Sequence, residues 1–135
     1  MTLKFIQSGE DALLIGAPGT GKSHLAKSAA QAATVAGYRV LYREAHLLFP
    51  EIYEATQLKM RGKKVKLFSE ADLVVIDDLF LRTKLPEDAA DDLQEIIMNR
   101  YTGRKSTLVT SNRVIEDWGK CLGDNAVASA ILDRL

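Results

Sequence analysis

A glycine-rich segment near the N-terminus carries the clearest chemical signal in this sequence. Residues 16–23 fit the pattern G-x-x-x-x-G-K-[ST], whose glycines allow backbone N–H groups to turn inward around phosphate oxygens. Lys22 is then placed to reach the β and γ phosphates of ATP, and Ser23 to offer its hydroxyl to Mg²⁺. The predicted nucleotide-binding residues are Gly16, Ala17, Pro18, Gly19, Thr20, Gly21, Lys22, Ser23 and His24. The alternative is a glycine-rich turn that matches by chance.

Two carboxylates follow an apolar run further along the chain. Residues 73–76 read Leu-Val-Val-Ile, and Asp77 and Asp78 come next. Ligands of parallel sheets bind at the carboxyl ends of the strands, so both acids are expected at a binding site. Asp77 is predicted to hold the Mg²⁺ shell and Asp78 to polarise the attacking water. Taken alone, such a pair also suits a solvated turn.

A third polar side chain ends another apolar segment. Asn112 follows residues 106–111, which read Ser-Thr-Leu-Val-Thr-Ser. If that segment is a strand beside the one that carries Asp77, Asn112 can orient the same water or sense the γ-phosphate. Asn is also common in turns and caps, which is the alternative interpretation.

The elements that must position these residues alternate between strands and helices. Residues 11–16 and 73–77 are expected as strands buried inside a sheet, residues 39–43 as a strand at or near its edge, and residues 106–111 as a further strand. A helix is expected from Lys22 to Gly37, with Ala26, Ala29, Ala30 and Ala33 on its buried face. Strands separated by helices predict one α/β domain with a parallel sheet over residues 1–135.

Two further helices are expected in the second half of the chain. One begins at Pro86, places Ala89, Leu93, Ile96, Ile97 and Tyr101 on one face, and ends at Gly103. The other begins after Asp124, a predicted N-cap, and carries an apolar face that includes Ala128 and Ile131. Both would cover the sheet.

The overall composition excludes several classes of protein. Lys plus Arg equals Asp plus Glu at 18 each, so the molecule as a whole is not drawn to nucleic acid or to an anionic membrane. Cys121 is the single cysteine, and His24 and His46 are the only histidines, which excludes an intramolecular disulfide and a histidine metal cluster. No signal-peptide or membrane-spanning run is present, and a cytoplasmic location is expected.

A local basic segment lies between the second and third predicted strands. Its charges suit contacts to DNA phosphates, which carry no sequence information and weaken with salt. The alternative is a solvated loop, the usual fate of a lysine-rich run. The residues concerned are Lys59, Arg61, Lys63, Lys64 and Lys66.

Several motifs together resemble one family over nearly the whole chain. They are GAPGTGKSHLA, ADLVVIDDLFLRTKLPEDAADDLQEIIMNRY, STLVTSN, EDWGK, LGD and ILDRL. In this combination the chain resembles the IstB-like ATPases, transposition helper proteins of insertion sequences within the AAA+ superfamily and near the DnaC helicase loaders. The resemblance implies a P-loop NTPase that binds ATP, forms an ATP-dependent homo-oligomer on duplex DNA and presents that DNA to a transposase.

The resemblance also assigns roles by position. It makes residues 16–23 the Walker A loop, Asp77 and Asp78 Walker B, and Asn112 sensor 1. Arg134, in ILDRL, falls where related ATPases carry an arginine finger that reaches the γ-phosphate of a neighbouring subunit; the alternative is a helix-end arginine in a surface ion pair. Most AAA+ proteins have Glu where Asp78 stands, which leaves the role of Asp78 as a base open.

The resemblance finally implies a missing part and leaves other functions open. Family members have helices ahead of residue 1 and continue after Leu135 with another strand and a lid, so a core truncated at both ends, with a bare apolar strand edge and weak ATP turnover, is expected. A DnaC-like helicase loader, a P-loop kinase for a small metabolite and a non-catalytic remnant are the alternatives.

Overall fold

Four parallel strands form a single sheet in this computed structural model, which describes residues 3–81, 85–86 and 88–135. The strand order is β1-β4-β3-β2, so every neighbouring pair is joined by a crossover rather than by a hairpin. The strands are β1 (Ala12–Ile15), β2 (Val40–Glu44), β3 (Leu73–Leu79) and β4 (Ser106–Ser111). The predicted parallel α/β architecture is confirmed.

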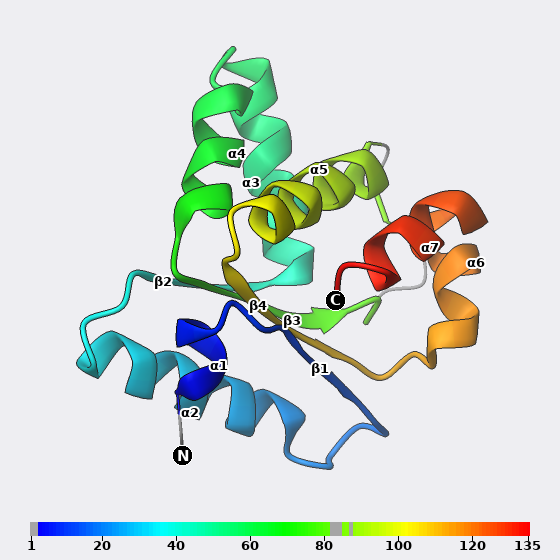
Figure 1. Cartoon of the computed structure of the whole chain (residues 1–135). Helices are drawn as coiled ribbons and strands as arrows, with labels where there is room; N and C mark the ends of the chain where they lie inside the picture. The colour runs from blue at the N-terminus through cyan, green and yellow to red at the C-terminus, as the bar shows by residue number, and fades with distance from the viewer. Residues whose placement is uncertain (1–2, 82–84, 87) are drawn as a thin grey trace.

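Helices cover both faces of this sheet (Figure 1). On one face lie α1 and α2, and on the other lie α3, α4, α5 and α7. Their bounds are α1 (Lys4–Gln7), α2 (Lys22–Val35), α3 (Ala45–Gln57), α4 (Arg61–Glu70), α5 (Ala89–Thr102), α6 (Trp118–Leu122) and α7 (Asn125–Leu132), with a short 3₁₀ helix η1 (Ile115–Asp117) ahead of α6. The result is a three-layer sandwich with a hydrophobic core on each side of the sheet.

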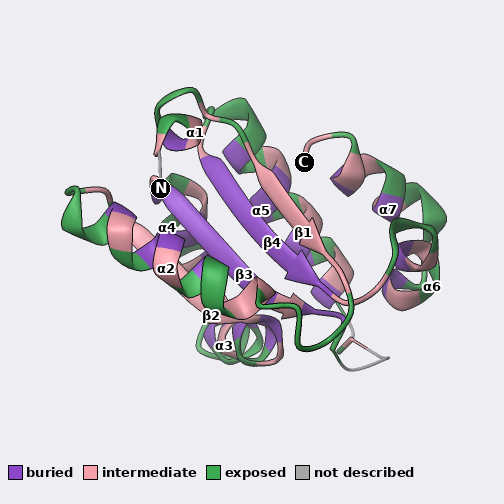
Figure 2. Ribbon diagram, turned by 90° about the horizontal axis from the view of Figure 1, so that it is seen from below, coloured by how far each residue is buried: buried purple, intermediate pink, exposed green. Residues whose placement is uncertain are grey.

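The position of each strand in the sheet decides how deeply it is buried. All six residues of β4 are buried, and so are six of the seven in β3, whereas β1 and β2 are half-buried throughout (Figure 2). The predictions of a central strand at residues 73–77 and an edge strand at residues 39–43 are confirmed. The prediction that residues 11–16 are buried on both faces is wrong, because among the described strands β1 pairs with β4 alone and forms the other edge of the sheet.

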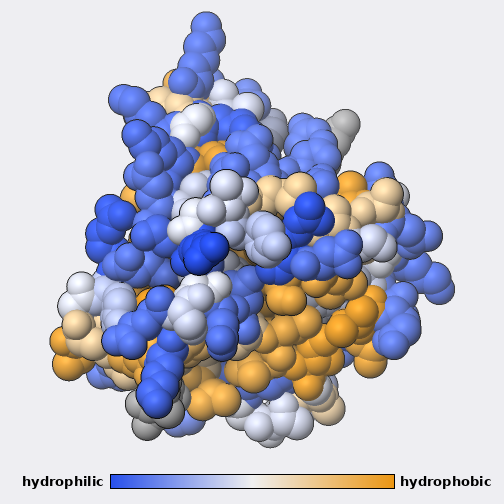
Figure 3. Space-filling model, in the orientation of Figure 1, coloured by the Kyte–Doolittle hydropathy of each residue, from blue (hydrophilic) through white to orange (hydrophobic). Residues whose placement is uncertain are grey.

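That edge is apolar, as the sequence predicts for a strand without a further neighbour. Leu13 and Ile15 pack partly against the larger core cluster, and so do Leu132 and Leu135 near the C-terminus. Figure 3 shows hydrophobic surface gathered on this side of the molecule. An unpaired strand edge with apolar side chains is a site where further chain can add by main-chain hydrogen bonding.

Helix α2 forms as predicted because small residues recur at helical spacing. It begins at Lys22, and Gly37 follows its C-terminus with a φ of +96°, a conformation that glycine adopts without strain. Ala26, Ala29, Ala30 and Ala33 are its buried residues. Their small side chains let the helix lie close to the sheet, which fixes the position of the preceding loop.

Helix α5 departs from its prediction at its N-terminus and in one residue of its buried face. It begins at Ala89 rather than at Pro86, and residue 87 lies outside the described part of the chain. Tyr101 was predicted on the buried face but is 58% exposed, since the inward position of the last turn belongs to Arg100. The buried Arg100 guanidinium donates to the carbonyl oxygens of Phe68 and Ala71, both at 2.7 Å. These hydrogen bonds offset the cost of burying a charge.

Helix α7 begins as predicted. The carboxylate of Asp124 accepts hydrogen bonds from the N–H groups of Ala126 (2.8 Å) and Val127 (3.2 Å), which confirms Asp124 as the N-cap. The predicted end of α5 at Gly103 is also confirmed, since Gly103 is the C-cap of that helix. Over the described ranges, no helix combines the length and apolar character that crossing a bilayer requires.

Candidate functional site

The loop formed by residues 16–23, called the phosphate loop below, joins β1 to the first turn of α2. Gly19 and Gly21 have φ values of +80° and +87°, which side-chain-bearing residues rarely adopt. Gly21 is the N-cap of α2, and no side chain caps that helix end. The first N–H groups of α2 are therefore left to a ligand, and the helix dipole favours an anionic one.

Lys22 bends back over this loop. Its ammonium group donates to the carbonyl oxygen of Ala17 (2.8 Å) and to the hydroxyl of Thr20 (3.3 Å), while that hydroxyl donates to the same carbonyl oxygen at 2.8 Å. Gly16 lies under this cluster, because a Cβ there would stand 3.4 Å from the Thr20 hydroxyl. The positive charge is thus held at the mouth of the loop, where phosphate oxygens can replace the neutral acceptors.

Asp77 is the centre of a hydroxyl network. Its carboxylate is 1% exposed and accepts hydrogen bonds from Ser23 (3.0 Å), Thr110 and Tyr42. Burial, and then the hydrogen bond to Asp77, raise the pKa of the Tyr42 hydroxyl well above its ordinary value, so this group keeps its proton and donates a hydrogen bond to Asp77. Three donors around one carboxylate satisfy a buried charge that would otherwise be costly.

These groups fit a magnesium ion better than a transition metal. Mg²⁺ takes oxygen ligands and is commonly bound through one or two carboxylates together with substrate phosphates. Ser23 and Asp77, the two predicted Mg²⁺ residues, supply a hydroxyl and a carboxylate that lie within hydrogen-bond distance of each other beside the phosphate loop. Across the described residues, no group of three His, Cys, Asp or Glu side chains could hold a metal ion on its own. A metal here would depend on phosphate oxygens for the rest of its shell.

Asp78 reaches the same place through a break in the strand. In a regular strand Asp77 and Asp78 would point to opposite faces. Here β3 contains an irregularity between Ile76 and Leu79, where three steps along β3 match two along β4. Asp78 takes a φ of +57°, and its N–H donates to the Thr110 hydroxyl at 2.8 Å. Such a bulge re-aims a side chain, and it turns Asp78 toward the phosphate loop.

The surroundings of Asp78 suit a proton acceptor. Burial, followed by the negative charges of Asp77 and Glu44, raises the pKa of this carboxyl, while Lys22 and His46 act in the opposite direction. A carboxylate with a raised pKa binds a proton more readily than an ordinary surface Asp. A carboxyl group with a raised pKa thus lines the same cavity as Lys22.

Most of the predicted site residues meet at one cavity. Its volume is about 290 Å³, and it lies between the phosphate loop and the carboxyl ends of β3 and β4. Its lining consists of Pro18, Gly19, Gly21, Lys22, Ser23, His24, Asp78, Leu81 and Asn112. Asp77 lies just behind this lining, joined to it through Ser23. Residues from three separate segments of the sequence are thus brought together.

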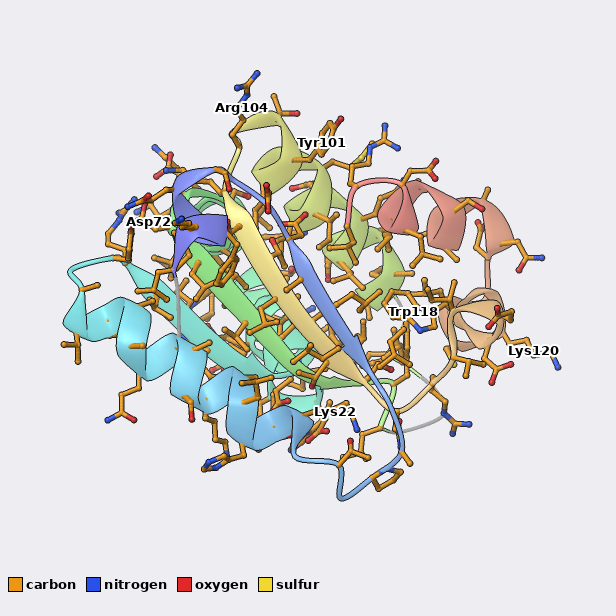
Figure 4. All side chains as sticks on the ribbon, turned by 60° about the horizontal axis from the view of Figure 1, so that its bottom comes forward. Lys22, Asp72, Tyr101, Arg104, Trp118 and Lys120 are labelled. Carbon is orange, nitrogen blue, oxygen red and sulfur yellow. The ribbon has the colours of Figure 1, made fainter. Side chains whose placement is uncertain are left out.

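Arg134 is placed elsewhere. Its guanidinium carbon lies 5.7 Å from the centre of the Tyr101 ring, and Nη1 donates to the carbonyl oxygen of Ala130 at 3.3 Å. Tyr101 and Lys22 lie at opposite ends of the molecule (Figure 4). The alternative of a surface ion pair is wrong within the described residues, where Arg134 has no carboxylate partner within 4.0 Å. Arg134 therefore does not belong to the cavity of its own chain.

Four of the five basic residues lie on helix α4 rather than in a solvated loop, while Lys59 lies in the turn before it, and part of the charge is already paired. Arg61 binds Asp92 (2.8 Å) and Glu95 (3.3 Å) on α5. Lys64 binds Glu51 on α3 (3.2 Å), and Lys66 lies 3.9 Å from Glu70 at the exposed surface. The prediction of five basic side chains available to DNA needs this correction.

Lys59 and Lys63 remain accessible. Both are exposed and, within the described residues, form no ion pair. With Lys66 they leave three lysines on the outer surface of the segment. The other two basic residues, Arg61 and Lys64, are paired with carboxylates of α5 and α3, because α4 packs against both helices.

Leu81 of the cavity lining was not predicted from the sequence, and neither were two polar residues of the site, Tyr42 and Thr110. Tyr42 belongs to β2, which is aligned so that Glu44 faces Asp77 across the ladder. Thr110 stands two positions before Asn112, and its hydroxyl links Asp77 to the N–H of Asp78. For Thr110, the signal in the sequence was a hydroxyl inside an otherwise apolar strand. For Tyr42 the sequence held no signal, because a local motif does not determine the register between two strands.

Comparison with known proteins places the chain in a family. The family model "IstB-like ATP binding protein" matches residues 1–135. The chain is 36% identical over 135 residues to the insertion sequence IS5376 putative ATP-binding protein of Geobacillus stearothermophilus, covering 100% of this chain and 53% of the relative. It is 34% identical to the IS21 putative ATP-binding protein of Pseudomonas aeruginosa, covering 98% of this chain and 49% of the relative.

A solved structure of the DnaC helicase loader is similar in fold. It superimposes with a TM-score of 0.78 at 25% identity, covering 97% of this chain and 81% of DnaC. By contrast, the chain spans about half the length of the two insertion sequence relatives, 53% and 49%. Together, the phosphate loop, the strand-end carboxylates, the sheet order and the match over every residue show that the chain belongs to the IstB-like ATP-binding protein family within the AAA+ fold.

Proposed function

We propose that this chain binds ATP with Mg²⁺ in the cavity beside Lys22 and hydrolyses it to ADP and phosphate. The observation that carries the proposal is the hydrogen bond of 3.0 Å between Ser23 and Asp77, which ties the phosphate loop to the end of β3 at the cavity wall. Membership of an ATP-binding family supports it.

The residues of the cavity divide the chemical work. The Lys22 ammonium would exchange the Ala17 carbonyl oxygen for phosphate oxygens, and the N–H groups at the start of α2 would hold the same anion. Asp78 would accept the proton of the attacking water, and Asn112 would orient that water. Mg²⁺, held by Ser23 and the Asp77 carboxylate, would neutralise charge on the phosphates.

We further propose that ATP-bound copies assemble on duplex DNA and assist a transposase. Two of the relatives are named as ATP-binding proteins of insertion sequences, which supports a role in transposition. Arg134 is the candidate residue for such assembly: it lies against Tyr101, remote from Lys22, so any nucleotide that it contacts would be bound to another copy. The exposed Lys59, Lys63 and Lys66 are the candidate contacts to DNA phosphates.

A second candidate function is the loading of a replicative helicase. The similarity to the DnaC helicase loader favours it. The two functions share the nucleotide site and differ in the partner protein. Co-purification with a transposase, measured beside co-purification with a replicative helicase and with ATP present, distinguishes them.

One experiment tests the proposed reaction. ATP turnover is measured with and without duplex DNA for the wild type, for Lys22→Ala and for the control Lys27→Ala, an exposed lysine one turn further along α2. We expect turnover that DNA stimulates, a loss of at least about 100-fold in Lys22→Ala, and little change in Lys27→Ala. Turnover that ignores DNA and transfers phosphate to a small acceptor would favour a kinase instead.

A further inference from the structure

The buried carboxylate of Asp77 has an unequal distribution of hydrogen bonds. Its Oδ1 atom accepts from the hydroxyls of Ser23 and Thr110, whereas Oδ2 accepts from the hydroxyl of Tyr42. A carboxylate offers about four acceptor positions, two on each oxygen. Oδ1 is therefore filled, and one position remains on Oδ2.

The Tyr42 hydroxyl is not needed for packing. Tyr42 and Val40 belong to the apolar layer between β2 and α2, in which phenylalanine would bury the same ring without a polar atom. A half-buried hydroxyl is costly unless it is hydrogen-bonded, and its recorded partner is Asp77. The contribution of this hydroxyl is therefore its hydrogen bond to the Asp77 carboxylate.

Together the three donors fix how the carboxylate is turned. Ser23 holds it from α2, Thr110 from β4 and Tyr42 from β2, so the group is held from three different elements. Without Tyr42 both remaining hydrogen bonds would fall on Oδ1, and Oδ2 would lose its recorded donor. The Tyr42 bond acts on Oδ2 directly and so restrains the direction of its free position.

We propose that Tyr42 is a positioning residue, whose hydroxyl holds the Asp77 carboxylate so that the remaining acceptor position on Oδ2 stays available to the Mg²⁺ shell of bound ATP. This inference rests on the proposed function. Tyr42 should therefore contribute to the increase in nucleotide affinity that Mg²⁺ produces. It should not contribute to nucleotide binding without metal, which depends on the phosphate loop.

The test separates these two parts of the affinity. Tyr42→Phe keeps the ring and removes the hydroxyl, and Tyr38→Phe does the same at a tyrosine packed against the same layer. For each protein, binding of a fluorescent ATP analogue is measured without metal and during titration with Mg²⁺. Urea unfolding is measured in parallel.

We expect Tyr42→Phe to need about 2- to 10-fold more Mg²⁺ for half-maximal binding, as befits the loss of one net hydrogen bond. Its metal-free affinity should stay within about twofold of the wild type, and Tyr38→Phe should match the wild type in both. Thr110→Val, which removes another donor to Asp77, should shift the Mg²⁺ titration in the same direction.

An unchanged Mg²⁺ titration in Tyr42→Phe would overturn the inference and leave the proposed function standing, with or without a change in unfolding. An equal loss of metal-free and metal-dependent affinity would also overturn it, since that result indicates general distortion. A wild type that binds no nucleotide, with or without Mg²⁺, would remove the proposed function as well.

Discussion

The Ser23 hydroxyl donates to Oδ1 of Asp77 at 3.0 Å, which joins two residues 54 positions apart in the sequence. One belongs to the first turn of α2 and the other to the end of β3. Strands β1 and β3 both pair with β4 and run parallel to it. The phosphate loop after β1 and the carboxylates of β3 therefore lie together at the carboxyl ends of the strands. The first prediction follows from this pair.

Replacing Ser23 should remove metal dependence rather than nucleotide binding. Ser23→Ala deletes the hydroxyl predicted to bind Mg²⁺, so we expect the gain in ATP affinity produced by Mg²⁺ to fall by about 10-fold or more, with metal-free affinity little changed. Fluorescence titration with and without Mg²⁺ measures both. Ser28→Ala, one turn further along α2, is the matched control. Full metal dependence in Ser23→Ala would exclude Ser23 from the magnesium site.

Neutralising Asp78 should separate catalysis from stability. Asp78→Asn removes the proposed base but keeps a residue that tolerates a positive φ. We expect ATP turnover to fall by about 10²- to 10⁴-fold, with nucleotide binding retained. Glu54→Gln on the exposed surface of α3 should leave turnover unchanged. Wild-type turnover in Asp78→Asn would place the base elsewhere.

The same variant predicts a pH effect of definite sign. The folded state raises the pKa of Asp78, chiefly by burial, and so binds its proton more tightly than the unfolded chain does. Ionisation of Asp78 therefore lowers the free energy of unfolding as pH rises through this raised pKa. Asp78→Asn cannot ionise, so it should be more stable than the wild type at pH 7. Urea unfolding at several pH values should show the difference shrinking as pH falls through the raised pKa and vanishing below about pH 4, the ordinary pKa of an Asp carboxyl.

Arg134 should act on a neighbouring chain. We expect Arg134→Ala to lose turnover by at least about 100-fold while it still binds ATP, and Lys120→Ala, an exposed change on α6, to have no such effect. Mixing Arg134→Ala with Lys22→Ala should restore part of the activity, since a pair of the two variants holds one intact composite site. If mixing restores nothing and turnover per chain is independent of concentration, Arg134 does not act between chains.

The basic segment should divide into two functional groups. Replacing Lys59, Lys63 and Lys66 with Ala should weaken binding to duplex DNA and reduce the slope of log affinity against log salt by about 2 to 3, the value expected for three phosphate contacts. The titration requires ATP at a saturating concentration. An unaltered slope would remove these three lysines from the DNA interface.

Arg61 provides the contrasting case. Its guanidinium holds Asp92 and Glu95, so Arg61→Ala should lower the free energy of unfolding by about 1–3 kcal/mol because it leaves the largely buried Asp92 without its partner. The effect on DNA affinity should be small once folding is complete. A large loss of DNA affinity in a fully folded Arg61→Ala would mean that the ion pairs open on DNA.

The parts of the site that depend on local sequence were predicted well. The phosphate loop is a contiguous motif, and Asp77 and Asn112 directly follow apolar runs, so parallel strands bring them to the same end of the sheet as that loop. The helix face of Ala26 and Ala29 follows from spacing alone in the same way. No knowledge of distant contacts was needed for any of these.

The parts that depend on distant contacts were missed or misjudged. Tyr42 reaches Asp77 only because β2 has a particular register with β3, and Asp78 turns inward only because β3 contains a bulge. Arg61 looked available to DNA because Asp92 lies on a helix whose packing the sequence does not specify. Tyr101 was placed inside because the pattern did not show that Arg100 would take that position.

The most direct test of the central claim is a calorimetric titration of the wild-type chain with a slowly hydrolysed ATP analogue, with and without Mg²⁺. We expect one analogue bound per chain, tighter with Mg²⁺, and binding lost or greatly weakened in Lys22→Ala. No saturable heat at millimolar analogue, or equal binding by Lys22→Ala, would contradict the assignment of the cavity beside Lys22 as the nucleotide site.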